Sequence, residues 1–350
     1  MRQRVGSRGA KRPWHSGDAT ATMVRVVGAQ DARGWTVVIK LGISACLLGE
    51  RVRYDGGHKL DEFLRDTLGR QVQYIPVCPE VECGMPIPRE AVRQVGDPAA
   101  PRLVTQKTGR DLTEQMLSWT RRRLDELEKE NLHGFVFKAK SPSSGMERVK
   151  IYDEAGNVHA RGPGMFAREF MRRFPLLPVE DEGRLHDPNL RENFIERIFA
   201  LGRYRETLAS DPSVRGLMAF HQRHKLLIMA HNERLVREMG RRVASAEKHE
   251  AGHMRDEYES MLLRALQSLA TPARHTNVLL HIAGHFKDRL ASDEKKELLD
   301  VIARFKAGDL PLIVPVTLLK HHVRKHEVDY LAGQAYLDPH PLELRLRNHA

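Results

Sequence analysis

The chain has 350 residues, of which 41% are hydrophobic and 29% are charged, a composition that predicts packed domains and argues against a largely disordered protein. No apolar run approaches the roughly 18 residues that a membrane-spanning helix needs. The formal net charge of +11 favours a polyanionic partner, nucleic acid first, although a basic surface without a specific partner explains it about equally well.

Residues 1–35 are basic and lack the apolar stretch of a secretory signal. We therefore expect a disordered basic tail here and a protein that stays in the cytoplasm. The 3 cysteines are an odd number, which argues against a framework of disulfide bonds. In a reducing compartment, clustered thiols more often bind metal or take part in chemistry.

Strands and helices are predicted to alternate over residues 36–175. Three runs have the apolar, β-branched character of buried strands: 35–45, 72–77 and 135–140. The spacing of apolar residues over 112–130 predicts a helix, so the order of elements favours a parallel sheet in a Rossmann-like α/β domain. Ligands of open α/β sheets bind beyond the carboxyl ends of the strands. The polar motifs that follow the three strands are therefore expected to meet; they begin at Cys46, Cys78 and Ser141.

Residues 176–190 contain prolines and aspartates that predict a linker, and residues 191–350 have the pattern of an all-α domain. Two segments of this domain, 221–225 and 318–326, concentrate histidines and cationic residues. Their candidate phosphate contacts are Arg223, Lys225, Lys320, Arg324 and Lys325. The alternative is that these charges belong to solvated helix faces.

The spacing of the cysteines leaves several interpretations open. Four residues separate Cys78 from Cys83, and Cys46 lies upstream of both. A structural zinc site would need a fourth ligand, for which His58 is the nearby candidate. Three thiolates instead suit a [4Fe–4S] cluster with one iron left open for a substrate sulfur. Buried structural thiols explain the pattern about as well, and redox chemistry is a third alternative.

Three motifs carry a resemblance to a known family: SACLLGERVRYDGGHK, CPEVECGMPIPRE and KAKSPSSGMERVKIY. Together they resemble the thiouracil desulfidase family over about residues 38–175. The resemblance implies a [4Fe–4S] cluster on three cysteines and the removal of sulfur from thiolated uracils. The second half resembles the helical domain fused to the desulfidase domain in proteins that desulfurate 4-thiouridine in tRNA. This similarity implies tRNA as the partner.

The resemblance also implies roles for single residues. Glu80 matches the catalytic glutamate of the family and is expected to be the general base, with a carboxylate that accepts N–H bonds of its loop as the alternative. Ser141 matches the catalytic serine. Stand-alone members resemble SPSCG in the third motif, where this chain has Ser144. The cluster ligands are therefore expected to be Cys46, Cys78 and, by elimination, Cys83.

Substrate contacts are expected from two further features. The paired glycines of the YDGGHK loop permit close backbone approach, so the loop is a candidate cradle for a base or phosphate, with a tight turn as the alternative. Its residues are Asp55, Gly56, Gly57, His58 and Lys59. Lys138 and Lys140 alternate on the third predicted strand and are expected to point the same way, which makes Lys140 a candidate for an anionic substrate. Ser143 and Ser144 compete with Ser141 for its role.

The leading hypothesis is an iron–sulfur-dependent, hydrolytic desulfidase that acts on 4-thiouridine in tRNA. Hydrolysis transfers no electrons, so we expect no nicotinamide or flavin cofactor, and we expect no membrane contact. One alternative is a desulfidase of free thiouracil. Another, from a different class, is an RNA-binding protein with a structural metal site.

Overall fold

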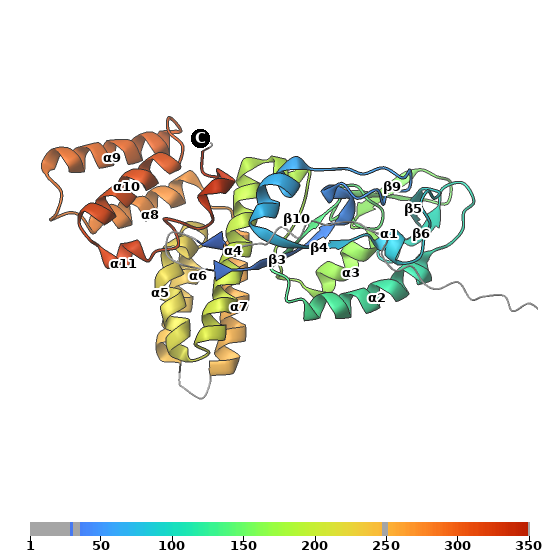
Figure 1. Cartoon of the computed structure of the whole chain (residues 1–350), viewed down its shortest axis with the longest axis horizontal. Helices are drawn as coiled ribbons and strands as arrows, with labels where there is room; N and C mark the ends of the chain where they lie inside the picture. The colour runs from blue at the N-terminus through green and yellow to red at the C-terminus, as the bar shows by residue number, and fades with distance from the viewer. Residues whose placement is uncertain (1–28, 31–35, 247–250, 349–350) are drawn as a thin grey trace, which may run out of the picture.

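The computed structural model describes residues 29–30, 36–246 and 251–348 (Figure 1), and most of the tail expected at residues 1–35 lies outside this part of the chain. Two short strands within it, β1 (Ala29–Gln30) and β2 (Thr36–Val37), pair antiparallel. Among the described residues, no helix combines the length and the apolar character needed to cross a membrane.

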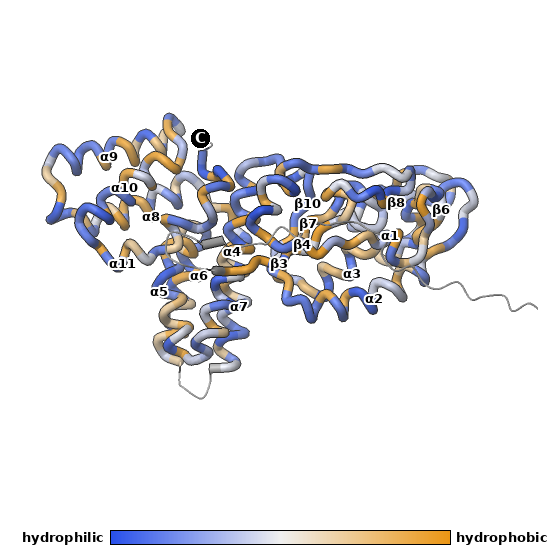
Figure 2. Tube along the Cα trace, in the orientation of Figure 1, coloured by the Kyte–Doolittle hydropathy of each residue, from blue (hydrophilic) through white to orange (hydrophobic). Residues whose placement is uncertain are grey.

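A four-stranded parallel sheet forms the centre of the N-terminal half, as predicted. In order across the sheet, its strands are β10 (Val179–Asp181), β7 (Gly134–Phe137), β3 (Ile39–Ser44) and β4 (Val72–Val77). Every residue of β7 is buried, and so is nearly all of β3. Strands buried on both faces need continuous apolar sequences, which is why β3 is largely hydrophobic in Figure 2.

A second, mixed sheet was not predicted. Its strands, in order, are β6 (Arg102–Thr105), β5 (Val92–Val95), β8 (Val149–Tyr152) and β9 (Val158–Gly162). These strands are short and include charged residues, so no continuous apolar run reveals them. Helices α2 (Thr113–Lys129) and α3 (Met165–Arg173) pack on β7 through a cluster of aromatic rings, formed by Trp119, Phe135, Phe137, Phe166 and Phe170.

The stretch expected to be a linker, residues 176–190, is instead part of the fold. It contains β10, which forms the edge of the parallel sheet and pairs Val179 with Phe135. It also contains Asp187, whose side chain caps the helix that follows. A strand of three residues is too short to give a periodic pattern, so its neighbouring prolines and aspartates resemble loop sequence.

The C-terminal half is helical, as predicted. Its helices are α4 (Pro188–Ser210), α5 (Val214–His231), α6 (Glu233–Ser245), α7 (Ala251–Gln267), α8 (Pro272–Gly284), α9 (Ser292–Ala307), α10 (Ile313–Lys325) and α11 (Asp329–Ala332). Helix α4 belongs to both halves: Phe194 and Ile198 pack into the core of the parallel sheet, whereas Tyr204 and Leu208 pack among the helices. The boundary expected at residue 191 therefore falls inside a shared helix.

The C-terminal segment returns to α4. Leu346 packs into the core of the sheet, and Arg347, which is 2% exposed, donates hydrogen bonds to Glu192 at 3.0 Å and Glu196 at 2.7 Å. Among the described residues, Glu192, Glu196 and His340 are the one group of three potential metal ligands whose ligand atoms lie within 4.8 Å of one another. The guanidinium already supplies the positive charge between the two carboxylates, so we interpret the group as an ion-pair cluster.

The buried His133 is predicted to make the protein less stable in acid. Its Nδ1 accepts a hydrogen bond from the backbone N–H of Lys40 at 3.0 Å, and 8% of the residue is exposed. Burial lowers the pKa of His133 from 6.5 to about 4, so between these pH values the unfolded chain binds more protons than the folded chain. The stability contributed by the neutral ring is lost as the pH falls through this window, by up to about 3 kcal/mol.

The variant His133→Asn keeps an acceptor for Lys40 and cannot titrate. Its loss of unfolding free energy between about pH 7 and pH 5, measured with urea, should be smaller than that of the wild type by roughly 2 kcal/mol. The matched control is His58→Asn, because His58 also accepts a backbone N–H, from Leu60 at 3.2 Å, but is exposed. If the wild type and His133→Asn lose the same unfolding free energy between these pH values, the acid sensitivity comes from other groups.

Candidate active site

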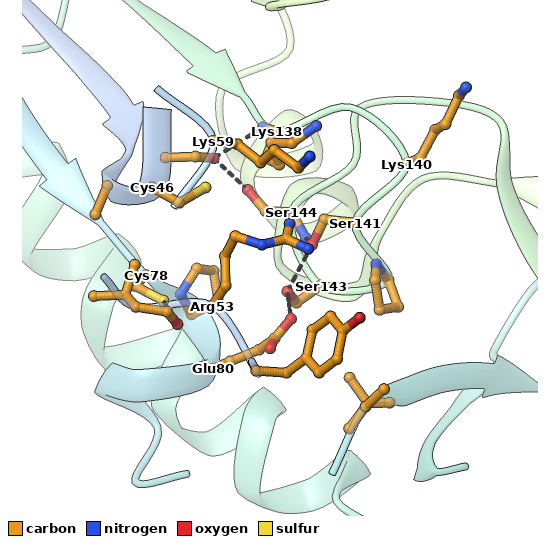
Figure 3. A pocket seen from close by; sticks show the side chains of 18 of the residues that line it. Cys46, Arg53, Lys59, Cys78, Glu80, Lys138, Lys140, Ser141, Ser143 and Ser144 are labelled. Carbon is orange, nitrogen blue, oxygen red and sulfur yellow. Dashed lines mark hydrogen bonds between the residues drawn. The ribbon is translucent and has the colours of Figure 1, made fainter. Parts of the chain in front are cut away.

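The carboxyl ends of β3, β4 and β7 open into a cavity of about 410 Å³ (Figure 3). Cys46 follows β3 in a 3₁₀ turn (Ala45–Leu48), and Cys78 directly follows β4. Residues 141–144 reach the same cavity from the end of β7. The structure thus brings the three polar motifs together, because the carboxyl ends of parallel strands meet at one edge of the sheet.

Two of the three thiols line this cavity, those of Cys46 and Cys78. Burial raises the pKa of Cys46 to about 12 and that of Cys78 to about 11. The neighbouring Cys78 adds to the increase at Cys46, since two thiolates close together repel each other. The backbone N–H of Lys59 donates to the carbonyl of Cys46 at 2.9 Å, so the YDGGHK loop is anchored beside that thiol.

Cys83, the third expected ligand, does not line the cavity. It follows the short helix α1 (Pro79–Glu82), where its N–H donates to the carbonyl of Pro79 at 3.1 Å. Its thiol donates to the carbonyl of Glu80 at 3.3 Å, and its side chain packs against the core that contains Met85. The elimination made from the sequence therefore led to a thiol that the turn of α1 directs toward the core.

Both carboxylate oxygens of Glu80 are held by neighbours. Arg89, whose side chain is 5% exposed, donates to Oε2 from Nε at 2.9 Å and from Nη2 at 2.6 Å. Ser143 donates from Oγ to Oε1 at 2.8 Å, and the hydroxyl oxygens of Ser141 and Ser143 are 3.1 Å apart. Glu80 is therefore connected to Ser141 through Ser143, and a proton can pass along these groups.

Ser144 and Ser44, which also line the cavity, form a second pair of hydroxyls. The two Oγ atoms are 2.8 Å apart, and Ser44 Oγ also accepts the backbone N–H of Lys138 at 2.9 Å. The turn is packed so closely that a Cβ on Gly145 would lie 2.7 Å from the carbonyl oxygen of Ser141. A side chain at this glycine would displace the turn that carries Ser143 and Ser144.

Positive side chains surround the cavity: those of Arg53, Lys59 and Lys138. Lys140 contacts the rim, but it has a φ of +60° and its amine points away from the cavity in Figure 3. β7 ends before Lys138, and residues 138–140 lead into a turn. The prediction that Lys138 and Lys140 alternate along one strand and point the same way is therefore wrong.

The YDGGHK loop forms a tight turn beside the cavity. Gly56 has a φ of +75°, and the N–H of Gly57 donates to Oδ1 of Asp55 at 3.0 Å. Lys59 lines the cavity, whereas Asp55, Gly56, Gly57 and His58 do not. The loop therefore has the geometry of a tight turn, which was the alternative to a cradle for a base or phosphate. Of its five predicted substrate contacts, Lys59 is the one that lines the cavity.

Tyr54 is a residue of the site that the sequence analysis missed. It lines the cavity, it is 42% exposed, and the guanidinium of Arg53 lies 5.5 Å from the centroid of its ring. An exposed aromatic ring at the mouth of a cavity offers a surface on which a planar base can stack. The signal in the sequence was an aromatic residue between a cation and a glycine-rich turn.

The five expected phosphate contacts lie on α5 and α10, in the helical half. Lys320 is paired with Asp338 at 2.6 Å, and Lys325 is paired with Glu294 at 2.6 Å. Lys225 lies over the ring of Tyr330, 5.0 Å from its centroid. The side chains of Arg223 and Arg324 are exposed. In Figure 1, α10 lies toward the opposite end of the long axis from the second sheet.

Comparison with known proteins gives a separate family match for each half of the chain. Residues 41–182 match the 2-thiouracil desulfurase family, and residues 225–341 match DUF1722, a family of unknown function. The uncharacterized protein YbgA of Escherichia coli (strain K12) is 31% identical over 155 residues, which are 43% of this chain and 90% of YbgA. The uncharacterized protein YbbK of Bacillus subtilis (strain 168) is 28% identical over 108 residues, 29% of this chain and 71% of YbbK.

A solved structure, that of the [4Fe-4S]-dependent thiouracil desulfidase TudS, is 30% identical and covers 43% of this chain and 94% of its own, with a TM-score of 0.35. Together, the fold and the family matches define a protein in which a thiouracil desulfurase domain precedes a helical DUF1722 domain. The chain belongs to the family of YbgA.

Proposed function

We propose that this protein is an iron–sulfur-dependent desulfidase that removes the sulfur of 4-thiouridine in tRNA, in the cytoplasm. The observation that carries the proposal is one cavity in which the thiols of Cys46 and Cys78 lie beside the hydrogen-bonded series Glu80, Ser143 and Ser141. The match of residues 41–182 to the 2-thiouracil desulfurase family supports the reaction. The net charge of +11 supports an RNA substrate.

The donor chemistry of the cavity fits a [4Fe–4S] cluster, since such clusters are held by thiolates and two thiols line one wall. Burial opposes the ionisation of both Cys46 and Cys78, so a positively charged metal group would compensate for the charge of their thiolates. Cys83 would have to leave its place after α1 to join them. When bound, the cluster would supply an open iron, a Lewis acid suited to a soft thiocarbonyl sulfur.

The protein's own residues would carry the proton chemistry. In our proposal, water attacks the C4 carbon of the thiolated base, and its proton passes from the position of Ser141 through Ser143 to Glu80. Arg89 holds the carboxylate toward Ser143. The carbon–sulfur bond then breaks as the new C4 hydroxyl gives up its proton to form the carbonyl, and this proton and the one held by Glu80 leave with the sulfur. Thiocarbonyl and water yield carbonyl and hydrogen sulfide, so no electrons are transferred and no nicotinamide or flavin is required.

The mouth of the cavity supports a polynucleotide over a free base. Arg53 and Lys59 can meet phosphate groups, and the exposed ring of Tyr54 can stack on a base. A thiolated base within folded RNA must leave its stack to reach the cavity. A free base has no phosphate group for Arg53 and Lys59 to meet.

The helical half is proposed to hold the tRNA body. Arg223 and Arg324 are exposed and suit phosphate contacts. Lys320 and Lys325 would have to give up their pairs with Asp338 and Glu294, so their contribution is expected to be smaller.

The test uses the full chain, reconstituted with iron and sulfide without oxygen. We expect about four irons per chain, as a [4Fe–4S] cluster requires. Incubation with tRNA should convert 4-thiouridine to uridine with release of one sulfide per base, measured by mass spectrometry of the nucleosides and by sulfide assay. Faster turnover of free 4-thiouracil than of tRNA would favour the small-molecule alternative. Tight, salt-sensitive binding of tRNA without sulfide release would favour an RNA-binding protein with a structural metal.

A further inference from the structure

We propose that the hydroxyl of Ser144 is the third protein ligand of the iron site, beside the thiolates of Cys46 and Cys78. This inference rests on the proposed function and deepens it.

The order of the strands in the sheet places Ser144 beside the two cysteines. The strands β7, β3 and β4 are neighbours in the sheet, and their carboxyl ends lead to Ser144, Cys46 and Cys78 in that order. All three side chains line the same cavity, and Ser144 is 3% exposed. In Figure 3 its hydroxyl points toward the wall that carries Cys46.

The oxygen of Ser144 is already fixed in this position. Its Oγ lies 2.8 Å from that of Ser44, and its backbone N–H donates to the Oγ of Ser141 at 3.1 Å. The turn that carries Ser144 is closed by the backbone N–H of Gly145, which donates to the carbonyl of Ser141 at 2.8 Å. A ligand that is held before the metal arrives loses little conformational freedom on binding.

Cys83 would require a rearrangement to serve instead. Moving its thiol to the cavity would break the hydrogen bond from that thiol to the carbonyl of Glu80.

Oxygen ligation has a measurable consequence. Cluster binding would form two Fe–Sγ bonds and one Fe–Oγ bond, and each ligand would release one proton to water, with no change in oxidation state. A hydroxyl oxygen is a harder ligand than a thiolate and suits iron–sulfur iron less well. We therefore expect a cluster that is lost more readily than one held by three thiolates.

The experiment compares Ser144→Cys, Ser144→Ala and Cys83→Ser with the wild type after anaerobic reconstitution. The readouts are iron content, the visible and electron paramagnetic resonance spectra, and the rate of iron release to a chelator. We expect Ser144→Cys to slow the release by roughly tenfold or more, the scale on which groups around a metal change its affinity. Ser144→Ala should lose iron faster, and Cys83→Ser should match the wild type. Thermal melts of the apo forms check that each variant folds.

Three results would overturn the inference. One is iron loss in Cys83→Ser with normal iron retention in Ser144→Ala, and another is equal iron release from the wild type, Ser144→Ala and Ser144→Cys. A wild type that retains no cluster while Ser144→Cys does so would show that the serine oxygen is no ligand. If the predicted order of release is found but 4-thiouridine is not consumed, the ligand assignment stands and the proposed function fails.

Discussion

Replacing Glu80 with glutamine is expected to slow the release of sulfide from thiolated tRNA by about 10²- to 10⁴-fold, the usual contribution of general acid–base catalysis. Glutamine has the same shape and can still accept a hydrogen bond from Arg89 through its amide oxygen. Its NH₂ group would then face Ser143, which now donates to Oε1 of Glu80 at 2.8 Å. The series from Ser141 would lose its proton acceptor while the wall of the cavity keeps its form.

The matched control for this variant is Glu90→Gln. Glu90 lies in the same loop sequence, but it accepts hydrogen bonds from the backbone N–H and the hydroxyl of Thr108, at 2.8 and 2.9 Å, and it does not line the cavity. The turnover of Glu90→Gln should equal that of the wild type. The iron content and the thermal midpoint of both variants must be measured beside their turnover rates. This control is needed because Glu80→Gln leaves the buried guanidinium of Arg89 without its anion and could destabilise the fold. Full turnover in a Glu80→Gln protein with normal iron content would exclude Glu80 as the base.

The edge of the sheet that carries the site could be predicted because strands that are buried on both faces have a recognisable run of apolar residues. β7 is a continuous apolar run and β3 is apolar except at Lys40 and Ser44, and the polar motifs that follow the two strands contrast with these sequences. Parallel pairing then places Cys46 and Cys78 at one mouth. The three-residue β10 has no such run, and it was consequently interpreted as part of a linker.

Contacts within the site depended on turn geometry that has no pattern in the sequence. Three serines lie within four positions of one another, and only the turn after Lys140, with its φ of +60°, determines that Ser143 is the one that reaches Glu80. Cys83 was chosen by counting thiols, whereas the short helix α1 decides which way its sulfur points. A count of residue types carries no directional information.

Surface charge was overestimated for a related reason. Lys320 and Lys325 were counted as free cations from their local sequence, but their carboxylate partners, Asp338 and Glu294, lie 18 and 31 positions away along the chain. Such pairs form only when segments far apart in the sequence pack together. Basic segments in a helical sequence therefore indicate possible phosphate contacts less reliably than exposed arginines in the folded structure do.

Replacing Arg347 with methionine is expected to lower the free energy of unfolding by about 3–5 kcal/mol, the cost of removing one partner from a buried charge cluster. Arg347 is 2% exposed and holds Glu192 and Glu196 on α4, the helix shared by both halves of the protein. Burial, followed by repulsion from Glu196, already raises the pKa of Glu192 to about 7. Without the guanidinium, this pKa should rise further. The folded state then binds more protons than the unfolded state, so the deficit of the variant should be larger at about pH 8 than at pH 6.

Arg345→Met is the matched control, because Arg345 lies two positions earlier in the same segment and is exposed. Its unfolding free energy should change by no more than about 0.5 kcal/mol. Adding Glu192→Gln to Arg347→Met removes one of the two carboxylates that have lost the guanidinium and should recover part of the loss, which a double-mutant cycle in urea quantifies. If Arg347→Met is no less stable than Arg345→Met, the cluster contributes no net stability. If the unfolding transitions of the sheet and of the helices, followed by separate spectroscopic signals, both shift in Arg347→Met, then α4 couples the two halves. This helix contributes apolar residues to both cores.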